Sequence, residues 1–220
     1  MSGRYFKKLT VRDIPLDNKI VLIRADYNVP LEPDGTIADD NRIQQSLPTL
    51  KYLLEERNCA LVICSHLGRP DTKNHKKLSL RPIAKHLSKL LDHRVDFVED
   101  CIGDKVKVAT KRLRPKSVIL LENLRFHEEE EENDLNFAKK LAQDSHARFF
   151  VQDGFGVVHR AHASTSAITQ FLPSVGGLLL EREYQHILGA IRNSKRPLTA
   201  VLGGAKIADK IEVIDEFIKL

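Results

Sequence analysis

Strand-length apolar runs that alternate with segments of helical periodicity constrain the fold of this sequence more than any other feature. Four runs are apolar at nearly every position, which indicates strands buried on both faces. Such strands form parallel sheets covered by helices on both sides. We therefore predict an α/β fold built on a doubly wound, Rossmann-like parallel sheet. The four runs are residues 20–23, 60–64, 118–121 and 149–151.

Segments with helical spacing of apolar residues lie between these runs. They predict helices near residues 41–57, 80–91, 101–113 and 131–145, and a shorter helix starting around Ser164. Pro82 falls in the first turn of the second helix, where a missing N–H costs little. A further strand is expected at residues 95–98. The order is that of repeated βα units.

A different unit is expected from residue 181 onward. Residues 1–180 would form the first domain, and residues 181–197 a hinge helix and linker. Residues 198–220 offer one strand and one helix, which cannot bury both of their apolar faces alone. We expect them to be the first βα unit of an incomplete second α/β domain, and the chain to be truncated.

Composition narrows the class of protein. Of the 220 residues, 42% are hydrophobic and 30% charged, with a net charge of +5. That excess could favour nucleic acid, but the basic residues are dispersed, and aromatic platforms for bases are few. The three cysteines have no paired metal spacing, which favours buried, reduced thiols. There is no apolar leader and no run of membrane-spanning length. We expect a soluble, cytoplasmic monomer without nucleic-acid or membrane partners.

Each of the four runs ends in a polar loop that carries arginine. Ligands of open parallel sheets bind outside the carboxyl ends of the strands. Arginines from four loops would therefore form a site for a small, multiply charged anion. These residues are Arg24, Arg69, Arg125 and Arg160.

Several of these residues have a simpler interpretation when taken singly. Asp26 and Asn28 are more typical of a turn than of a site. Arg24 could be a structural ion-pair partner, and Arg42 a solvated residue near a helix start. The acidic run of residues 128–132 reads as a solvated charge block at a helix N-terminus.

Two loops carry sharper signals. In residues 65–70 (SHLGRP), the glycine permits close backbone approach, and His66 and Arg69 supply donors for phosphate or carboxylate. His159 and His162 stand three apart and could bind zinc, but no carboxylate or cysteine partner is evident. We prefer an anion-binding Arg160 positioned by histidines, and we predict no metal site.

A third glycine-containing segment lies near the end of the chain. Gly203 and Gly204 form a strand-to-helix turn whose N–H groups suit phosphate, with Lys206 and Lys210 on one helical face. It lacks the Gly-Lys-Ser/Thr ending of a Walker motif, and alone it is a weak signal.

Together these segments closely resemble the phosphoglycerate kinase family, in order and approximate spacing along nearly the whole chain. The matching motifs are residues 24–30 (RADYNVP), 65–70 (SHLGRP), 121–126 (LENLRF), 159–164 (HRAHAS) and 203–211 (GGAKIADKI).

The resemblance implies two Rossmann-like domains joined by a helical hinge. The first would bind 3-phosphoglycerate or 1,3-bisphosphoglycerate, and the second Mg²⁺ with ADP or ATP, for reversible phosphoryl transfer between them. Arg42 and Lys206 would be catalytic, neutralising the transferring phosphoryl group. Nucleotide contacts would come from Gly203, Gly204, Lys206 and Lys210. Phosphoglycerate contacts would come from Asp26, Asn28, Arg42, His66, Leu67, Gly68, Arg69, Arg125 and Arg160.

The chain departs from the family pattern at several points. Gln152 and Gly154 stand where the family usually has asparagine and alanine, and Arg182 where it more often has lysine. On this resemblance, we expect these 220 residues to lack most of the nucleotide domain. The first hypothesis is therefore a kinase of which this is the N-terminal half. The alternative is a non-catalytic chain that only binds 3-phosphoglycerate. A third, less favoured, is an anion- or nucleic-acid-binding protein that has lost the activity.

Overall fold

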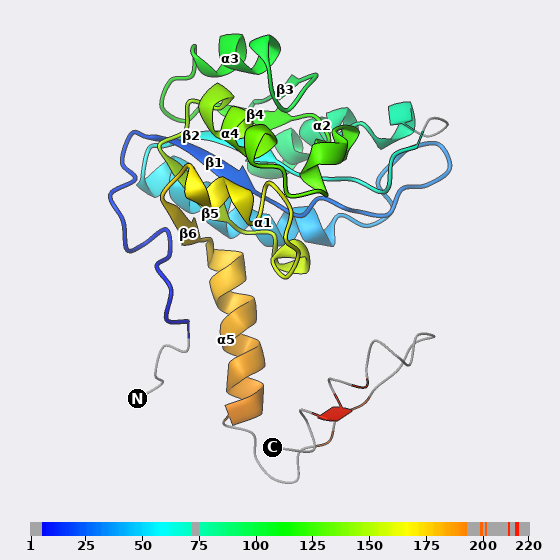
Figure 1. The fold of residues 1–220 in the computed structure, drawn as a ribbon, viewed down its shortest axis with the longest axis vertical. Helices are drawn as coiled ribbons and strands as arrows, with labels where there is room; N and C mark the ends of the chain where they lie inside the picture. Colours follow the sequence, from blue (N-terminus) through cyan, green and yellow to red (C-terminus); the bar gives the residue numbers. More distant parts are fainter. Residues whose placement is uncertain are drawn as a thin grey trace. The chain divides into compact units, whose positions relative to one another are not determined.

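A computed structural model of the chain describes residues 6–71 and 75–192, together with the isolated positions 199, 201, 211, 214 and 215. The predicted parallel sheet is confirmed, with strand order β3-β4-β2-β1-β5-β6 (Figure 1). Its strands are β1 Ile20–Arg24, β2 Ala60–Cys64, β3 Val95–Val98, β4 Val118–Leu121, β5 Phe149–Gln152 and β6 Ser174–Gly176.

Five α-helices lie in the part of the chain that the structure describes. They are α1 Asn41–Lys51, which continues as a π-helical turn at Tyr52–Glu56, α2 Arg81–Leu91, α3 Asp104–Thr110, α4 Leu135–Asp144 and α5 Leu178–Arg192. Short 3₁₀ turns occupy His75–Leu78, Leu124–Phe126, Glu128–Glu130, Phe155–Val157 and Ala167–Gln170. None of the described helices is both long and apolar enough to cross a membrane.

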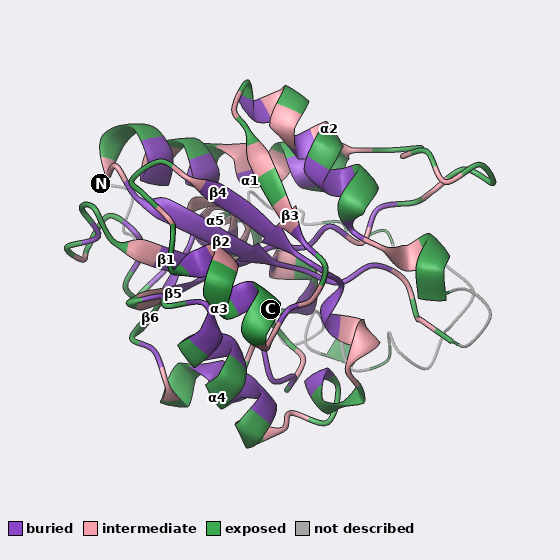
Figure 2. Cartoon of the chain, turned by 90° about the horizontal axis from the view of Figure 1, so that it is seen from above, coloured by how far each residue is buried: buried purple, intermediate pink, exposed green. Residues whose placement is uncertain are grey.

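Strand β1 shows why the apolar runs are continuous. Val21 and Ile23 belong to the core under α1 and α2, whereas Leu22 belongs to the core under α3 and α4. Successive side chains of a strand point to opposite faces, so a sheet with two covered faces needs apolar residues at every position. Figure 2 shows the buried strands between the two helical layers. β1 pairs in register with β2 on one side and β5 on the other, and its loop therefore emerges between theirs.

Some local expectations were wrong. The segment after Ser164 forms only the 3₁₀ turn Ala167–Gln170 and no α-helix, and strand β6 was not predicted. The three cysteines are buried and free, as predicted.

The chain divides into two compact units. The sheet unit spans Lys8–Glu181, and residues 1–7 and 182–220 belong to the other. Helix α5 begins at Leu178, before the predicted hinge start at residue 181. The expected linker, the strand at 198–202 and the helix after it lie outside the described residues apart from isolated positions. The three-part domain division therefore stays a prediction.

Candidate anion-binding site

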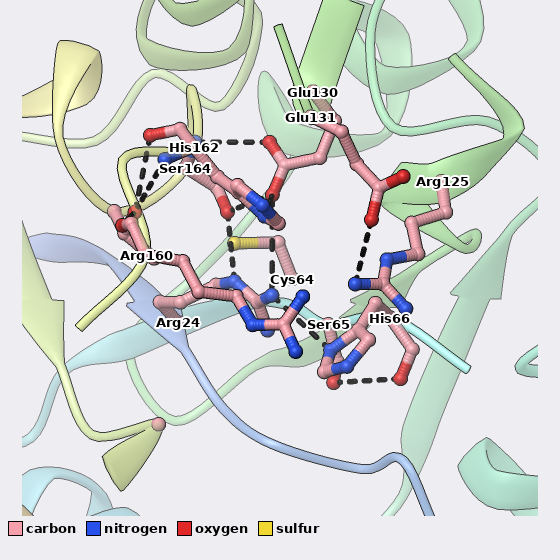
Figure 3. A network of polar contacts seen from close by, with 12 residues as sticks. Arg24, Cys64, Ser65, His66, Arg125, Glu130, Glu131, Arg160, His162 and Ser164 are labelled. Carbon is pink, nitrogen blue, oxygen red and sulfur yellow. Dashed lines mark hydrogen bonds and ion pairs between the residues drawn. The ribbon is translucent and has the colours of Figure 1, made fainter. Parts of the chain in front are cut away.

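The arginines predicted to form an anion site gather at the carboxyl ends of β1, β2, β4 and β5. Figure 3 shows the side chains of Arg24, Arg125 and Arg160 converging around His66, each from a different segment. His66 is only 3% exposed and Arg24 only 1% exposed. The parallel sheet produces this arrangement because all its strands end at the same edge.

The pKa of His66 is lowered to about 2. Burial is the largest cause, followed by the positive fields of Arg24, Arg125, Arg160 and Arg42. Four guanidinium groups are therefore close enough to oppose a further positive charge on this ring. His66 is neutral at physiological pH.

Arg24 is the innermost of these arginines. Its Nε donates to Ser164 Oγ at 2.7 Å, one terminal nitrogen donates to the Ala25 carbonyl, and the other contacts His66 Nδ1 at 3.2 Å. All three nitrogens thus have protein partners. Of the two interpretations open from sequence, the structure favours a structural role for Arg24 over direct ligand contact.

Arg125 lies where β4 leads into a 3₁₀ turn. It donates to the Gly68 carbonyl at 2.8 Å and pairs with Glu131 at 2.7 Å. Burial lowers its pKa, with smaller contributions in the same direction from Arg160, Arg24 and Arg69, whereas Glu131 opposes them. The Nε atoms of Arg125 and Arg160 are buried without a hydrogen bond in the described structure. Both arginines thus retain donor capacity.

Asp26, Asn28 and Arg42 form the next part of the site. Asp26 accepts from Arg42 and from the Asn28 backbone N–H at 3.2 Å. Asn28 Oδ1 accepts the Gly68 N–H at 2.8 Å and so joins the loops after β1 and β2. Arg42 remains 49% exposed, which leaves part of its guanidinium open to a ligand. Asp26 therefore holds Arg42, and Asn28 links two of the loops at this edge of the sheet.

The loop after β5 approaches this region closely. A Cβ atom at Gly156 would lie 2.4 Å from Asp26 Oδ2, so a side chain there would displace the carboxylate. Gly154 has an ordinary φ of −88°. A Cβ at that position would lie 3.1 Å from the Val157 side chain, so alanine, as in the family pattern, needs only a small shift.

The remaining predicted contacts differ in accessibility. Arg69 is exposed. Leu67 is buried, and its N–H and carbonyl pair with the Asn123 side chain at 3.2 and 2.8 Å. The sequence reasoning did not single out Asn123 as a site residue, although it lies in the polar loop that carries Arg125. Gly203, Gly204, Lys206 and Lys210 lie outside the described residues.

Glu130 contradicts the expectation of a solvated acidic run. It is fully buried, accepts from both the hydroxyl and the N–H of Ser164, and lies 3.9 Å from Arg24 and from His162. The pattern of consecutive glutamates could not reveal this, because the burial depends on the segment after Arg160 folding over it. The neighbouring Glu128 and Glu129 are exposed, as predicted.

The zinc alternative gains no support from the geometry. Among the described residues, the group of potential ligand atoms found within 4.8 Å of one another is Asp100, Cys101 and His127, which includes neither His159 nor His162. His162 instead lies beside Glu130, and burial lowers its pKa.

A hollow of about 710 Å³ lies elsewhere, at the amino-terminal ends of β1 and β5. Its lining combines exposed basic residues with an apolar wall that includes Phe149, Phe171 and Leu172. A small, multiply charged anion is matched better by the partly buried arginines at the other edge of the sheet.

Comparison with known proteins supports the family resemblance that the motifs indicated. The sequence model of the phosphoglycerate kinase family matches residues 11–220. Phosphoglycerate kinase of Prochlorococcus marinus (strain MIT 9515) is 48% identical over 204 residues, which cover 92% of this chain and 50% of that protein. That of Moorella thermoacetica is 48% identical, with coverages of 94% and 52%.

Solved structures give the same result. The crystal structure of phosphoglycerate kinase from Pyrococcus horikoshii OT3 superposes with a TM-score of 0.86 at 32% identity, over 96% of this chain and 52% of that one. The structure from Coxiella burnetii gives 0.82 at 36% identity, with the same coverages. The chain thus spans about half the length of the relatives it matches. On the family match and these identities, the chain belongs to the phosphoglycerate kinase family.

Proposed function

We propose that the sheet unit binds 3-phosphoglycerate or 1,3-bisphosphoglycerate. The observation that carries this proposal is the convergence of Arg24, Arg125, Arg160 and Arg42 on one neutral histidine. A ligand with a phosphate at one end and a carboxyl or acyl phosphate at the other would offset several of these positive charges. Guanidinium groups bind both kinds of oxyanion through paired hydrogen bonds.

We assign two different roles to the residues of the proposed site. Arg42, Arg69, Arg125 and Arg160 supply donors to the anionic groups, and His66 supplies a neutral donor. The other predicted contacts shape the loops: Asp26 and Asn28 order the turn after β1, and the backbones of Leu67 and Gly68 are held by Asn123, Asn28 and Arg125.

For the complete protein we propose the family reaction, reversible phosphoryl transfer between 1,3-bisphosphoglycerate and ADP giving 3-phosphoglycerate and ATP. Arg42 and Lys206 would neutralise charge on the transferring group, because phosphoryl transfer depends mainly on positioning and electrostatic stabilisation. Gly203, Gly204, Lys206 and Lys210 would hold the nucleotide phosphates.

Mg²⁺ would enter with the nucleotide, where it neutralises phosphate charge. The arginine-rich cluster is a donor set suited to anions and not to a hard cation, which prefers oxygen ligands. We therefore assign no Mg²⁺ ligand within the sheet unit. We also propose that the protein acts in the cytoplasm as a monomer.

The second candidate is a chain that binds 3-phosphoglycerate without turnover. It is favoured by one observation: the arginine cluster lies wholly within the sheet unit. A coupled assay with ADP and 1,3-bisphosphoglycerate tests the second candidate. We expect these 220 residues to show no turnover, and measurable turnover would remove the second candidate.

Binding can be tested by calorimetric titration of 3-phosphoglycerate. We expect saturable binding by the wild-type chain and binding weakened on the order of tenfold or more by Arg125→Met, which removes charge-assisted hydrogen bonds. Arg94→Met is the matched control, because Arg94 is exposed and forms an ion pair with its near neighbour Asp96. Absence of binding by the folded wild type, or equal affinities of the two variants, would refute the site.

A further inference from the structure

Glu130 is a buried acid behind the arginines, at the centre of a polar network (Figure 3). Its Oε1 accepts the Ser164 hydroxyl, and its Oε2 accepts the Ser164 N–H at 2.9 Å. Its backbone carbonyl also accepts the Ala163 N–H at 2.9 Å. Glu130 therefore fixes the segment that follows Arg160 by both side chain and main chain.

The chemistry of the partners sets the direction of the hydrogen bonds. Arginine can only donate, so the bond between Arg24 Nε and Ser164 Oγ uses the serine oxygen as acceptor. The single hydroxyl hydrogen of Ser164 is then directed to Glu130. The hydrogen bonds therefore run from Arg24 through Ser164 to Glu130. The Glu130 carboxyl group lies 3.9 Å from the Arg24 guanidinium.

The same rule fixes the protonation of His66. The other end of the Arg24 guanidinium contacts His66 Nδ1 at 3.2 Å, and it too can only donate. Nδ1 must therefore be the unprotonated nitrogen. A neutral ring with a bare Nδ1 carries its hydrogen on Nε2.

We propose that Glu130 is a positioning residue for the anion site. Through Ser164 it orients Arg24, and Arg24 holds His66 as the neutral tautomer that donates from Nε2. The donor that His66 offers to phosphoglycerate thus depends on an acid that is fully buried. This inference deepens the proposed function and rests on it for the identity of the ligand.

A merely structural Glu130 would behave differently from a positioning one. If it served only to balance the buried charge of Arg24, its loss would lower stability and leave the ring of His66 unchanged in the molecules that fold. If it positions Arg24, its loss frees the guanidinium from Ser164, and both tautomers of His66 become populated. The tautomer of His66 therefore separates the two roles.

The test compares the full chain with Glu130→Gln, Ser164→Ala and Glu128→Gln. The glutamine side chain has one acceptor oxygen and no charge. One of the two Ser164 donors therefore loses its acceptor, and the Arg24 guanidinium loses its ion-pair partner. Glu128→Gln is the matched control, since it removes the same charge from an exposed neighbour in the same 3₁₀ turn. Ring nitrogen shifts of His66 report the tautomer by NMR, and calorimetry with 3-phosphoglycerate reports the affinity.

We expect the wild type and Glu128→Gln to show one tautomer, with the hydrogen on Nε2. Glu130→Gln and Ser164→Ala should show a mixture and bind 3-phosphoglycerate on the order of tenfold more weakly, from loss of an oriented hydrogen bond. If Glu130→Gln fails to fold, Ser164→Ala decides, because it keeps the acid beside Arg24.

Two results overturn the inference: a mixed tautomer in the wild type, or a single Nε2–H tautomer with unchanged affinity in folded Glu130→Gln, or in Ser164→Ala where Glu130→Gln does not fold. If even the wild type fails to bind 3-phosphoglycerate, the proposed function fails. The tautomer comparison still decides the role of Glu130, because it requires no ligand.

Discussion

Acidification should destabilise this protein through His66. The pKa of the buried ring is lowered from its usual 6.5 to about 2 by desolvation and by the surrounding arginines. Below pH 6.5 the unfolded chain therefore takes up a proton at His66 that the folded chain refuses. A depressed folded-state pKa gives stability that is present above pH 6.5 and is lost as the pH falls toward 2.

The magnitude follows from linkage between protonation and folding. The loss approaches about 1.4 kcal/mol per pH unit once the unfolded histidine is protonated. Between pH 7 and pH 5, a single group with these two pKa values costs about 2 kcal/mol of unfolding free energy. For a domain of ordinary stability this is a large fraction of the total.

The matched variant is His66→Gln, whose oxygen can still accept from Arg24 but which does not titrate. We would measure urea unfolding of both proteins at pH 7 and pH 5 by far-UV circular dichroism, because the chain has no tryptophan. A buffer without phosphate avoids occupying the anion site. We expect the wild type to lose about 2 kcal/mol more than the variant. Parallel pH profiles would show that His66 titrates normally and would refute the reasoning.

Three other changes test separate parts of the structure. Gly156→Ala should weaken 3-phosphoglycerate binding on the order of tenfold, because its Cβ would lie 2.4 Å from Asp26 Oδ2. Gly154→Ala should have a smaller effect, because its Cβ would approach the Val157 side chain only to 3.1 Å; equal affinities of the two variants in calorimetry would contradict this. Asp134→Ala should cost about 1 kcal/mol in urea unfolding, because Asp134 caps α4 by accepting the Phe137 N–H at 2.7 Å, and an unchanged midpoint would count against the cap. Raising the salt concentration should weaken 3-phosphoglycerate binding steadily in calorimetric titrations, since added ions screen the charges, and salt-independent affinity would argue against an arginine-dominated site.

The sheet and its helical layers were predictable because the information for them is local. A strand buried on both faces needs apolar residues at every position, and residues 20–23 and 60–64 show that pattern openly. Strand β6 was not predictable. It has three residues, begins with an exposed Ser174, and exists because the edge of β5 offers it a partner.

The candidate site, too, was predictable from the sequence only in part. The sequence by itself placed Arg125 and Arg160 in loops after strands, and the parallel topology required those loops to meet at one edge. It could not determine that Arg24 is fully enclosed, that His66 is a neutral donor, or that Glu130 is buried while Glu128 is exposed. Those properties depend on which distant groups surround each side chain.

Ser164 shows the physical reason. It lies 140 residues from Arg24 and 34 from Glu130, yet its hydroxyl joins the two. Apolar periodicity is a property of consecutive residues, so the sequence determined strands β1–β5, the helices around them and the arginine-bearing loops. Desolvation and hydrogen-bond direction arise only when remote segments exclude water together, so the tertiary structure decided the charge, tautomer and orientation of the groups within the site.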